Sequence, residues 1–200
     1  MKKNIIAFAY CFLVISSIQI NVQAADAENG KVAFETCRGC HSSPGYSNVY
    51  PTYYVPKIGG QRPEYTIAAL TAYKDQSRPR GSMTANTFNL SKKTIENIAA
   101  HIQNSGGSIS PAPASGDLIK GKKLAQSCLS CHTDKLDDGG ANPILAGQYG
   151  NYLVKVMKDY QSGKRKNAIM QGMLKDFSKD DLEDIAAYFA SMKGLTTSVN

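Results

Sequence analysis

The sequence contains few histidines and cysteines, and nearly all of them lie in two short stretches. Of 200 residues, three are histidines and five are cysteines. Six of these eight residues form two copies of one pattern, in which two cysteines separated by two residues are followed at once by a histidine. Only Cys11 and His101 lie outside the pattern. A zinc site elsewhere in the chain is therefore disfavoured, because zinc needs about four such ligands.

A long apolar run is also missing after the first 24 residues. At the N-terminus, Lys2 and Lys3 precede an apolar stretch over residues 5–20 and a small-residue ending at Ala24. This order is typical of an export signal. The stretch is shorter than the roughly 20 residues that span a bilayer, and no later one is both long and free of charge. We expect residues 1–24 to be removed, leaving a chain outside the cytoplasm with no transmembrane segment.

The sequence has a moderate excess of basic side chains, but no basic stripe. Removing Lys2 and Lys3 from the 23 basic side chains leaves 21 against 16 acidic ones, a formal charge of +5. The basic residues are spread along the chain, and segments such as 120–123 and 164–166 are typical of solvated faces or of docking patches for an acidic partner. We therefore expect no nucleic-acid partner.

The chain contains two copies of one unit. The pattern that starts at Cys37 recurs 91 positions later at Cys128, and after a loop that differs by four residues the offset becomes 87. At this offset, identical residues include Pro56 and Pro143, Gly60 and Gly147, Gln61 and Gln148, Tyr65 and Tyr152, Arg78 and Arg165, and Met83 and Met170. Residues 105–116 are rich in glycine, serine and proline, which is typical of a linker. We predict one domain over residues 25–104 and another over 117–200.

Helix signals recur in both copies, whereas alternating strand patterns are lacking. A short helix is expected to end at each cysteine pair, over residues 26–37 and 117–128. A second helix is expected to start near Pro63, because proline suits the first helical turn. The last helix of each copy has a serine cap, Ser91 or Ser178, and an apolar face. The predicted fold is all-α, in two tandem duplicated domains.

The pattern C-x-x-C-H is the attachment motif of a covalently bound c-type haem. The two thiols add across the haem vinyl groups, and the next imidazole reaches the iron from one face. A lone C-x-x-C could equally be a redox disulfide or half of a zinc site, but two complete motifs behind an export signal disfavour both. We therefore expect two haem c groups, bound through Cys37 and Cys40 and through Cys128 and Cys131, with His41 and His132 as iron ligands.

The ligand on the other face of each iron separates an electron carrier from most catalysts. Met83 and Met170 are each five residues after an arginine and eight before the serine cap, in a loop that can fold over the haem. A thioether opposite histidine raises the reduction potential and blocks substrate access. Met173 competes with Met170, but Met83 has no such neighbour in the first copy. The repeat therefore favours Met83 and Met170 as axial ligands.

With two such units, a methionine in each and a short linker, the mature chain resembles the dihaem cytochrome c4 family over its whole length. The resemblance implies two class I cytochrome c domains packed about a pseudo-twofold axis. It also implies a periplasmic carrier that moves single electrons from a quinol-oxidising complex toward a terminal oxidase or reductase. Such a carrier is not an enzyme, and we expect a monomer or weak dimer.

The resemblance also extends to residues around the haem ligands. It implies that the carbonyls of Pro56 and Pro143 accept hydrogen bonds from the ligating imidazoles, which fixes the rings and tunes their basicity. Arg78 and Arg165 are candidates to pair with haem propionates, with surface exposure as the alternative interpretation.

Two other functions stay open on the sequence. A catalytic dihaem cytochrome, of the peroxidase or thiosulfate-oxidising type, would have one open or weakly ligated iron. A dihaem subunit would dock permanently on an oxidoreductase complex. The methionine available in both copies favours the carrier over the catalyst.

The copies differ most in the segment that follows the first motif. Residues 42–54 are rich in tyrosine, and their counterpart over residues 133–142 is shorter and tyrosine-free. We interpret the tyrosine-rich segment as a packing loop, in preference to a lid over the haem edge or a docking surface. The two haems are expected to differ in environment and in potential.

Overall fold

The computed structural model describes residues 24–48, 53–78, 80–105, 114–132 and 142–197. The predicted export signal up to residue 23 and most of the predicted linker lie outside these residues. The fold is all-α, as predicted, except that β1 (Ser47–Asn48) and β2 (Tyr53–Tyr54) pair antiparallel in the tyrosine-rich segment. Within the described ranges, no helix is long and apolar enough to cross a membrane.

In the first half, local signals in the sequence set where the helices begin. The helices are α1 (Ala27–His41), α2 (Pro63–Lys74), α3 (Gly81–Thr87) and α4 (Lys92–Asn104). The side chain of Asp26 accepts hydrogen bonds from the first turn of α1, and that of Ser91 caps α4. These caps satisfy N–H groups that have no partner within the helix. The predicted serine cap and the start of α2 at Pro63 are confirmed.

The second half repeats this order with one change. Its helices are α5 (Leu118–Leu124), the 3₁₀ helix η1 (Ala125–Ser127), α6 (Gly150–Gln161), α7 (Ala168–Leu174) and α8 (Lys179–Ser191). The prediction of one α-helix over residues 117–128 is wrong at its end, because the chain tightens into η1 before Cys128. In the first half, α1 continues through the motif to His41.

A second correction concerns the two candidate methionines. Met83 and Met170 were expected in loops, but they lie in the short helices α3 and α7. The side chain of Asn167 caps α7 and accepts a hydrogen bond from the backbone N–H of Met170 at 3.0 Å. Each of these helices has only seven residues, too few for a clear apolar period in the sequence.

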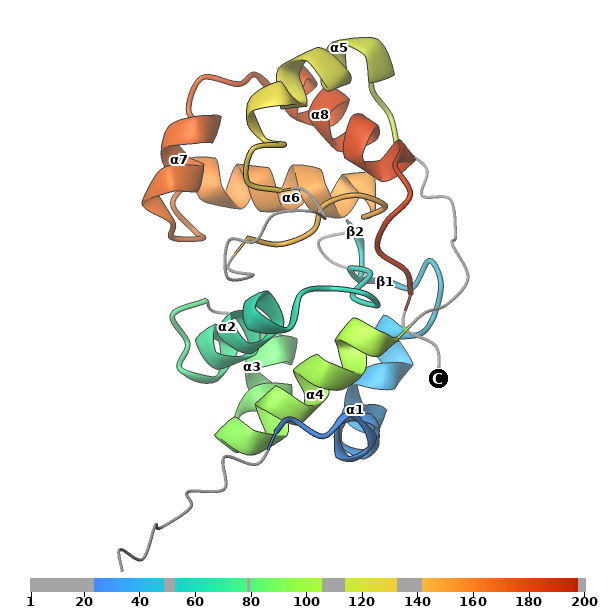
Figure 1. The fold of residues 1–200 in the computed structure, drawn as a ribbon. Coiled ribbons are helices and arrows are strands. Elements are labelled where there is room, and N and C mark those ends of the chain that lie inside the picture. The colour runs from blue at the N-terminus through green and yellow to red at the C-terminus, as the bar shows by residue number, and fades with distance from the viewer. Residues whose placement is uncertain (1–23, 49–52, 79, 106–113, 133–141, 198–200) are drawn as a thin grey trace, which may run out of the picture.

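The two halves lie against each other as two groups of helices (Figure 1). Two contacts join them besides those of the equivalent loops and of the arginines and tyrosines described below. The hairpin β1–β2 of the first half reaches α6 of the second. The segment after α8 runs back to the first half, where Thr196 and Gly59 exchange two backbone hydrogen bonds of 2.9 and 3.0 Å. Its Leu195 also donates to Ala146 O at 2.8 Å, so this segment contacts equivalent loops of both halves.

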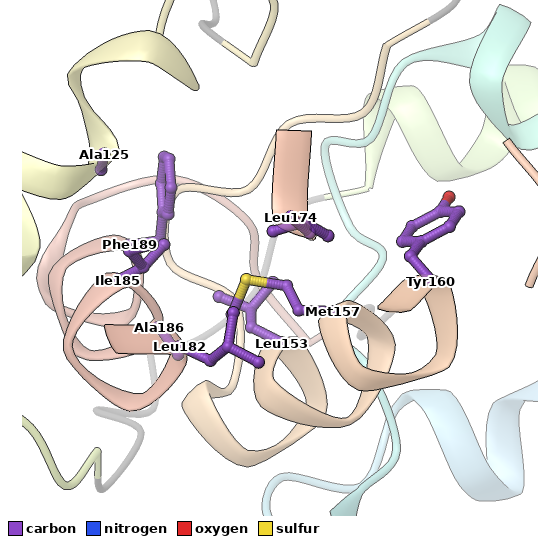
Figure 2. Close-up of a cluster of buried hydrophobic side chains, with 9 residues drawn as sticks. All are labelled: Ala125, Leu153, Met157, Tyr160, Leu174, Leu182, Ile185, Ala186 and Phe189. Atoms are coloured by element: carbon purple, nitrogen blue, oxygen red, sulfur yellow. The ribbon is translucent and has the colours of Figure 1, made fainter. Parts of the chain in front are cut away.

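Each half has its own cluster of buried apolar side chains. In the second half the cluster comes mainly from α6 and α8, with Leu174 of α7 and Ala125 completing it (Figure 2). Leu153, Met157 and Tyr160 are one and two turns apart on α6, and they belong to one cluster with Ile185 and Phe189 of α8. The first half has a smaller cluster, formed by Phe34, Leu70, Ile95, Ile98 and Ile102.

Two glycines let the helix pairs of the halves approach closely. A Cβ on Gly30 of α1 would lie 1.9 Å from the carbonyl oxygen of Asn97 in α4. A Cβ on Gly121 of α5 would lie 2.0 Å from the carbonyl oxygen of Asp184 in α8. Both distances are to backbone atoms, so an added Cβ could be accommodated only if the helix backbones moved apart. The two crossings are equivalent in the repeat.

The carboxyl group of Asp181 links α5 to the start of α8. Lys120 Nζ lies 2.8 Å from Asp181 Oδ1 and 2.9 Å from Asp184 Oδ2. Ser178 and Asp181 also form a capping box at the start of α8. The hydrogen bond from Lys120, followed by those from Ser178, lowers the pKa of Asp181 to about 2.

A pH dependence follows from this lowered pKa. An unfolded aspartate has a pKa of about 3.9, so the interaction stabilises the fold above that pH and is lost as the pH falls toward 2. Lys120→Met is expected to raise the pKa of Asp181 and to shift acid unfolding to higher pH. The pKa is measured by ¹³C NMR of the carboxyl, and Lys122→Met, at an exposed position of the same helix, serves as the control. An Asp181 pKa that stays the same in Lys120→Met would refute the assignment.

Candidate functional site

A cavity of about 770 Å³ lies between the two halves and is lined by both. The predicted ligands and attachment residues that line it are Cys37, Cys40, His41, Met83, Cys128, His132 and Met170. Cys131 is the one motif residue outside the lining, and it is exposed. The fold therefore brings the candidate residues of both repeats to one connected space.

In the first half, the motif occupies the last turns of α1. Cys40 is exposed and Cys37 is half-buried, and burial raises the pKa of the Cys37 thiol. His41 is buried, and its Nδ1 lies 3.0 Å from the carbonyl oxygen of Pro56. Burial lowers the pKa of His41, so the imidazole is neutral near pH 7. A neutral ring that donates from Nδ1 keeps the lone pair of Nε2 for a metal.

The second half reproduces this arrangement on a different backbone. The motif forms a turn after η1, in which His132 N donates to Cys128 O at 2.9 Å. His132 is also buried, and its Nδ1 lies 2.9 Å from the carbonyl oxygen of Pro143. Burial raises the pKa of the Cys128 thiol as it does that of Cys37. Both imidazoles are thus buried and bonded to a proline carbonyl, although the helix that precedes them differs.

The methionines differ in their relation to the cavity. Met83 and Met170 line it and pack against the apolar clusters of their halves. Met173 is 43% exposed, and it is not among the described residues that line the cavity. The geometry therefore favours Met170 over Met173 as a ligand within the cavity.

Two arginines and two tyrosines meet at the boundary between the halves. Arg165 donates to the Tyr65 hydroxyl at 3.2 Å, and Arg78 lies 3.5 Å from the same hydroxyl and 3.4 Å from that of Tyr152. The guanidinium groups of Arg78 and Arg165 stack on Tyr73 and Tyr160 at 4.6 and 4.7 Å. All six residues line the cavity.

The charges of this cluster change the acidity of Tyr65. Burial opposes its ionisation, but Arg78 and Arg165 outweigh burial and lower the pKa of the Tyr65 hydroxyl to about 8. In the described part of the chain, neither guanidinium forms an ion pair with a carboxylate. Two cations on the wall of a cavity, held only by phenols, suit a ligand that carries carboxylates.

The residues of each half fit a c-type haem. Each half offers two thiols, an imidazole with one nitrogen left for a metal, and a thioether, and part of its apolar cluster lines the same cavity. The guanidinium groups of Arg78 and Arg165 line the same cavity, and a propionate is the kind of anion that a guanidinium binds. A haem would bring four-coordinate iron in its ring, and the protein would complete it with one ligand on each face.

Sequence reasoning missed three residues at the boundary. Gln61 and Gln148 were recognised as repeat partners, but no role was assigned to them, and Lys57 was not noticed. Lys57 is 2% exposed, and its Nζ donates to Gly147 O at 2.8 Å in the other half. The sequence signal for the glutamines was their identity in register, beside a glycine in both copies.

The tyrosine-rich segment packs across the boundary, in agreement with the packing interpretation. Tyr53 is 4% exposed, and the rings of Tyr54 and Tyr149 lie 4.9 Å apart. Gly45 N donates to the Tyr149 hydroxyl at 3.0 Å, and Tyr54 N donates to Asn151 Oδ1 at 3.3 Å. Residues 49–52 of this segment lie outside the described ranges.

Known cytochromes are similar to this chain in sequence and in structure. The family model described as cytochrome c matches residues 118–193. Cytochrome c-554(548) of Halomonas halodenitrificans is 37% identical over 82 residues, which cover 39% of this chain and 99% of that protein. The structure of reduced recombinant cytochrome c4 from Pseudomonas stutzeri matches with a TM-score of 0.71 and 27% identity, over 84% of this chain and 100% of that chain.

Part of a thiosulfate dehydrogenase chain of Marichromatium purpuratum has a similar fold. The match has a TM-score of 0.70 and 23% identity, and covers 82% of this chain and 40% of that chain. At this identity the likeness concerns the fold alone.

Proposed function

Because this chain belongs to the cytochrome c family, we propose that it moves single electrons between respiratory partners in the periplasm. It does so as a dihaem carrier of the cytochrome c4 type, with two covalent haem c groups. The proposed donor is a quinol-oxidising complex, and the proposed acceptor is a terminal oxidase or reductase. The proposed domains are residues 25–104 and 117–200, joined by residues 105–116 after removal of an export signal.

The observation that carries this proposal is the matched pair of ligand sets in one cavity. We assign Cys37, Cys40, His41 and Met83 to the first haem and Cys128, Cys131, His132 and Met170 to the second. A haem iron held between histidine and methionine exchanges single electrons without binding a substrate. The carbonyls of Pro56 and Pro143 fix the two imidazoles. A methionine bound to each iron would occupy the position that a substrate needs.

The shared cavity also supports electron exchange between the two haems. The Tyr65 hydroxyl contacts Arg78 of its own half and Arg165 of the other, so both guanidinium groups lie at one point of the boundary. If each pairs with propionates of its haem, the propionate edges of the two haems are held near each other. Such an arrangement suits a carrier that accepts and passes on one electron at a time.

Absorption spectra of the purified full chain test the carrier against the catalytic alternative. We expect two low-spin haems in the ferric and ferrous states, and no change in the ferrous spectrum when carbon monoxide is added. Rapid carbon monoxide binding at one haem would show an open iron and favour a peroxidase or thiosulfate-oxidising enzyme. Cyanide added to the ferric protein gives the corresponding test in the other redox state.

A further inference from the structure

Two glutamines occupy equivalent turns at the boundary between the halves. Gln61 N donates to Ile58 O at 3.0 Å, and Gln148 N donates to Leu145 O at 3.1 Å. The residues before them, Gly60 and Gly147, have φ values of +80° and +77°. A type II turn requires a positive φ at this position, which glycine adopts without strain. The repeat has therefore kept the same turn in both copies, and with it the placement of the glutamine.

Each glutamine binds the backbone of the opposite half. Gln148 Oε1 accepts from Lys57 N at 2.9 Å, and Gln148 Nε2 donates to Lys57 O at 2.8 Å. Gln61 Oε1 accepts from Ile144 N at 3.0 Å, and Gln61 Nε2 donates to Ile144 O at 3.1 Å. Lys57 and Ile144 are equivalent in the repeat. The two glutamine contacts are thus related by the same pseudo-symmetry as the haem sites.

The orientation of each side-chain amide is set by its surroundings. Gln148 Oε1 also accepts from Tyr149 N, and Gln61 Oε1 from Arg62 N, both at 3.0 Å. Each oxygen therefore receives two N–H donors, while each Nε2 faces a carbonyl. Only one orientation of the amide satisfies all three partners. The glutamines are 5% and 4% exposed, so water does not compete for these bonds.

The peptide group that Gln148 binds is also the one whose carbonyl is bonded to His41, the candidate iron ligand. Lys57 N and Pro56 O belong to one peptide group, and Pro56 O lies 3.0 Å from His41 Nδ1. A chain of hydrogen bonds therefore runs from Gln148 through this peptide to His41. Its counterpart runs from Gln61 through the peptide of Pro143 and Ile144 to His132. Because a peptide group is conjugated, a hydrogen bond donated by its N–H strengthens the one accepted by its carbonyl.

We propose that Gln61 and Gln148 are positioning residues that tune the axial histidine of the haem in the opposite half. Gln148 of the second half acts on His41, and Gln61 of the first half acts on His132. The proposal rests on the ligation by His41 and His132 given under the proposed function. Each haem then depends on the docking of both halves, so its potential reports whether the other half is in place.

The direction of the effect follows from ligand basicity. A stronger bond from Nδ1 to the proline carbonyl makes the imidazole a more basic ligand, which stabilises ferric iron. Loss of the glutamine weakens that bond, and the haem becomes easier to reduce. Neighbouring hydrogen bonds strengthen one another by about 10–30% per bond. We therefore expect a modest change, of about two- to threefold, in the ratio of ferrous to ferric haem at a given solution potential.

The test is a redox titration of Gln148→Leu in the full holoprotein, followed by NMR of the haem methyl groups. Contacts with the thioether protons of each cysteine pair assign the methyl signals to one haem. We expect the ferrous-to-ferric ratio of the first-half haem to rise about two- to threefold, while the second-half haem stays unchanged. In the ferrous protein, the Nδ1 proton of His41 should move upfield as its hydrogen bond weakens. Gln61→Leu should give the mirror result, at His132 and the second-half haem.

Two further variants separate tuning from simple loss of packing. Gln148→Glu keeps the shape of the side chain and the accepting oxygen, so the ferrous-to-ferric ratio of the first-half haem should stay at or below that of the unaltered protein. This variant keeps the test available if Gln148→Leu does not fold. Gln103→Leu, at an exposed position of α4, should change neither haem. A shift of the haem in the same half as the substitution, equal shifts of both haems, or no shift would refute the proposal.

The unaltered protein provides the check on the ligands themselves. Ring protons of His41 and His132 must show the large shifts of a residue bound to haem iron. Their absence would overturn the proposed ligation and, with it, the proposed function. Normal ligand signals together with a failed cross-half pattern would overturn only the role of the glutamines.

Discussion

Met170→Ala is expected to remove about half of the near-infrared band that ferric haem shows when methionine is its ligand. Met170 lines the cavity from α7, which the Asn167 cap holds in place, so its loss leaves the iron of the second haem with one protein ligand. The open position should then bind carbon monoxide in the ferrous state. The potential of this haem should fall, because the thioether that raised it is gone. The near-infrared absorption of the ferric protein and the carbon monoxide spectrum measure both effects.

Met173→Ala is the matched control for this prediction. Met173 lies on the same helix, three residues further on, but it is 43% exposed. Its replacement should leave the band, the potential and the carbon monoxide response as they are. If Met173→Ala removes the band and Met170→Ala does not, the assignment of the second axial ligand is wrong and the repeat register misleads at this position.

Gly121→Ala is expected to destabilise the second half by about 3 kcal/mol, at the upper end of the usual cost of overpacking. The added Cβ would lie 2.0 Å from the carbonyl oxygen and 2.6 Å from the carbonyl carbon of Asp184, both in the backbone of α8. The two helices must therefore move apart, which also weakens the contact of Lys120 with Asp181 and Asp184. Chemical denaturation followed by the absorption of the haems measures the change.

Gly172→Ala provides the comparison, because it adds the same methyl group where there is room. Gly172 is exposed on α7, and a Cβ there would meet nothing within 4 Å. In a helix, alanine is favoured over glycine by about 0.5–1 kcal/mol, so this variant should be as stable as the unaltered protein or slightly more so. Equal stability of Gly121→Ala and Gly172→Ala would show that α5 and α8 are not tightly packed at this crossing.

The parts of the fold that depend on neighbouring residues could be predicted from the sequence. Pro63 and the serine caps determine where helices begin, because a fixed φ or a side-chain oxygen acts within one turn. The cysteine and histidine motifs fix the cofactor because the attachment chemistry needs these groups at this spacing. The repeat then identified Met83 and Met170, which both line the cavity.

The contacts across the boundary could not be predicted in this way. That Gln148 binds the peptide after Pro56, or that Lys57 reaches Gly147, depends on how two folded halves dock. Residues about 90 positions apart carry no local signal of such a pairing. The helices α3 and α7 were missed for another reason, since seven residues make too few turns to show an apolar stripe.

The hairpin β1–β2 has a consequence for the history of the chain. It belongs to the first copy, and it contacts Tyr149 and Asn151, which lie in the second. The duplicated halves have therefore ceased to be interchangeable. A chimaera built from two second copies would inherit both glutamine turns but would lack Tyr53 and Tyr54, because residues 133–142 contain no tyrosine. The two copies have thus diverged where they contact each other, so that neither can replace the other.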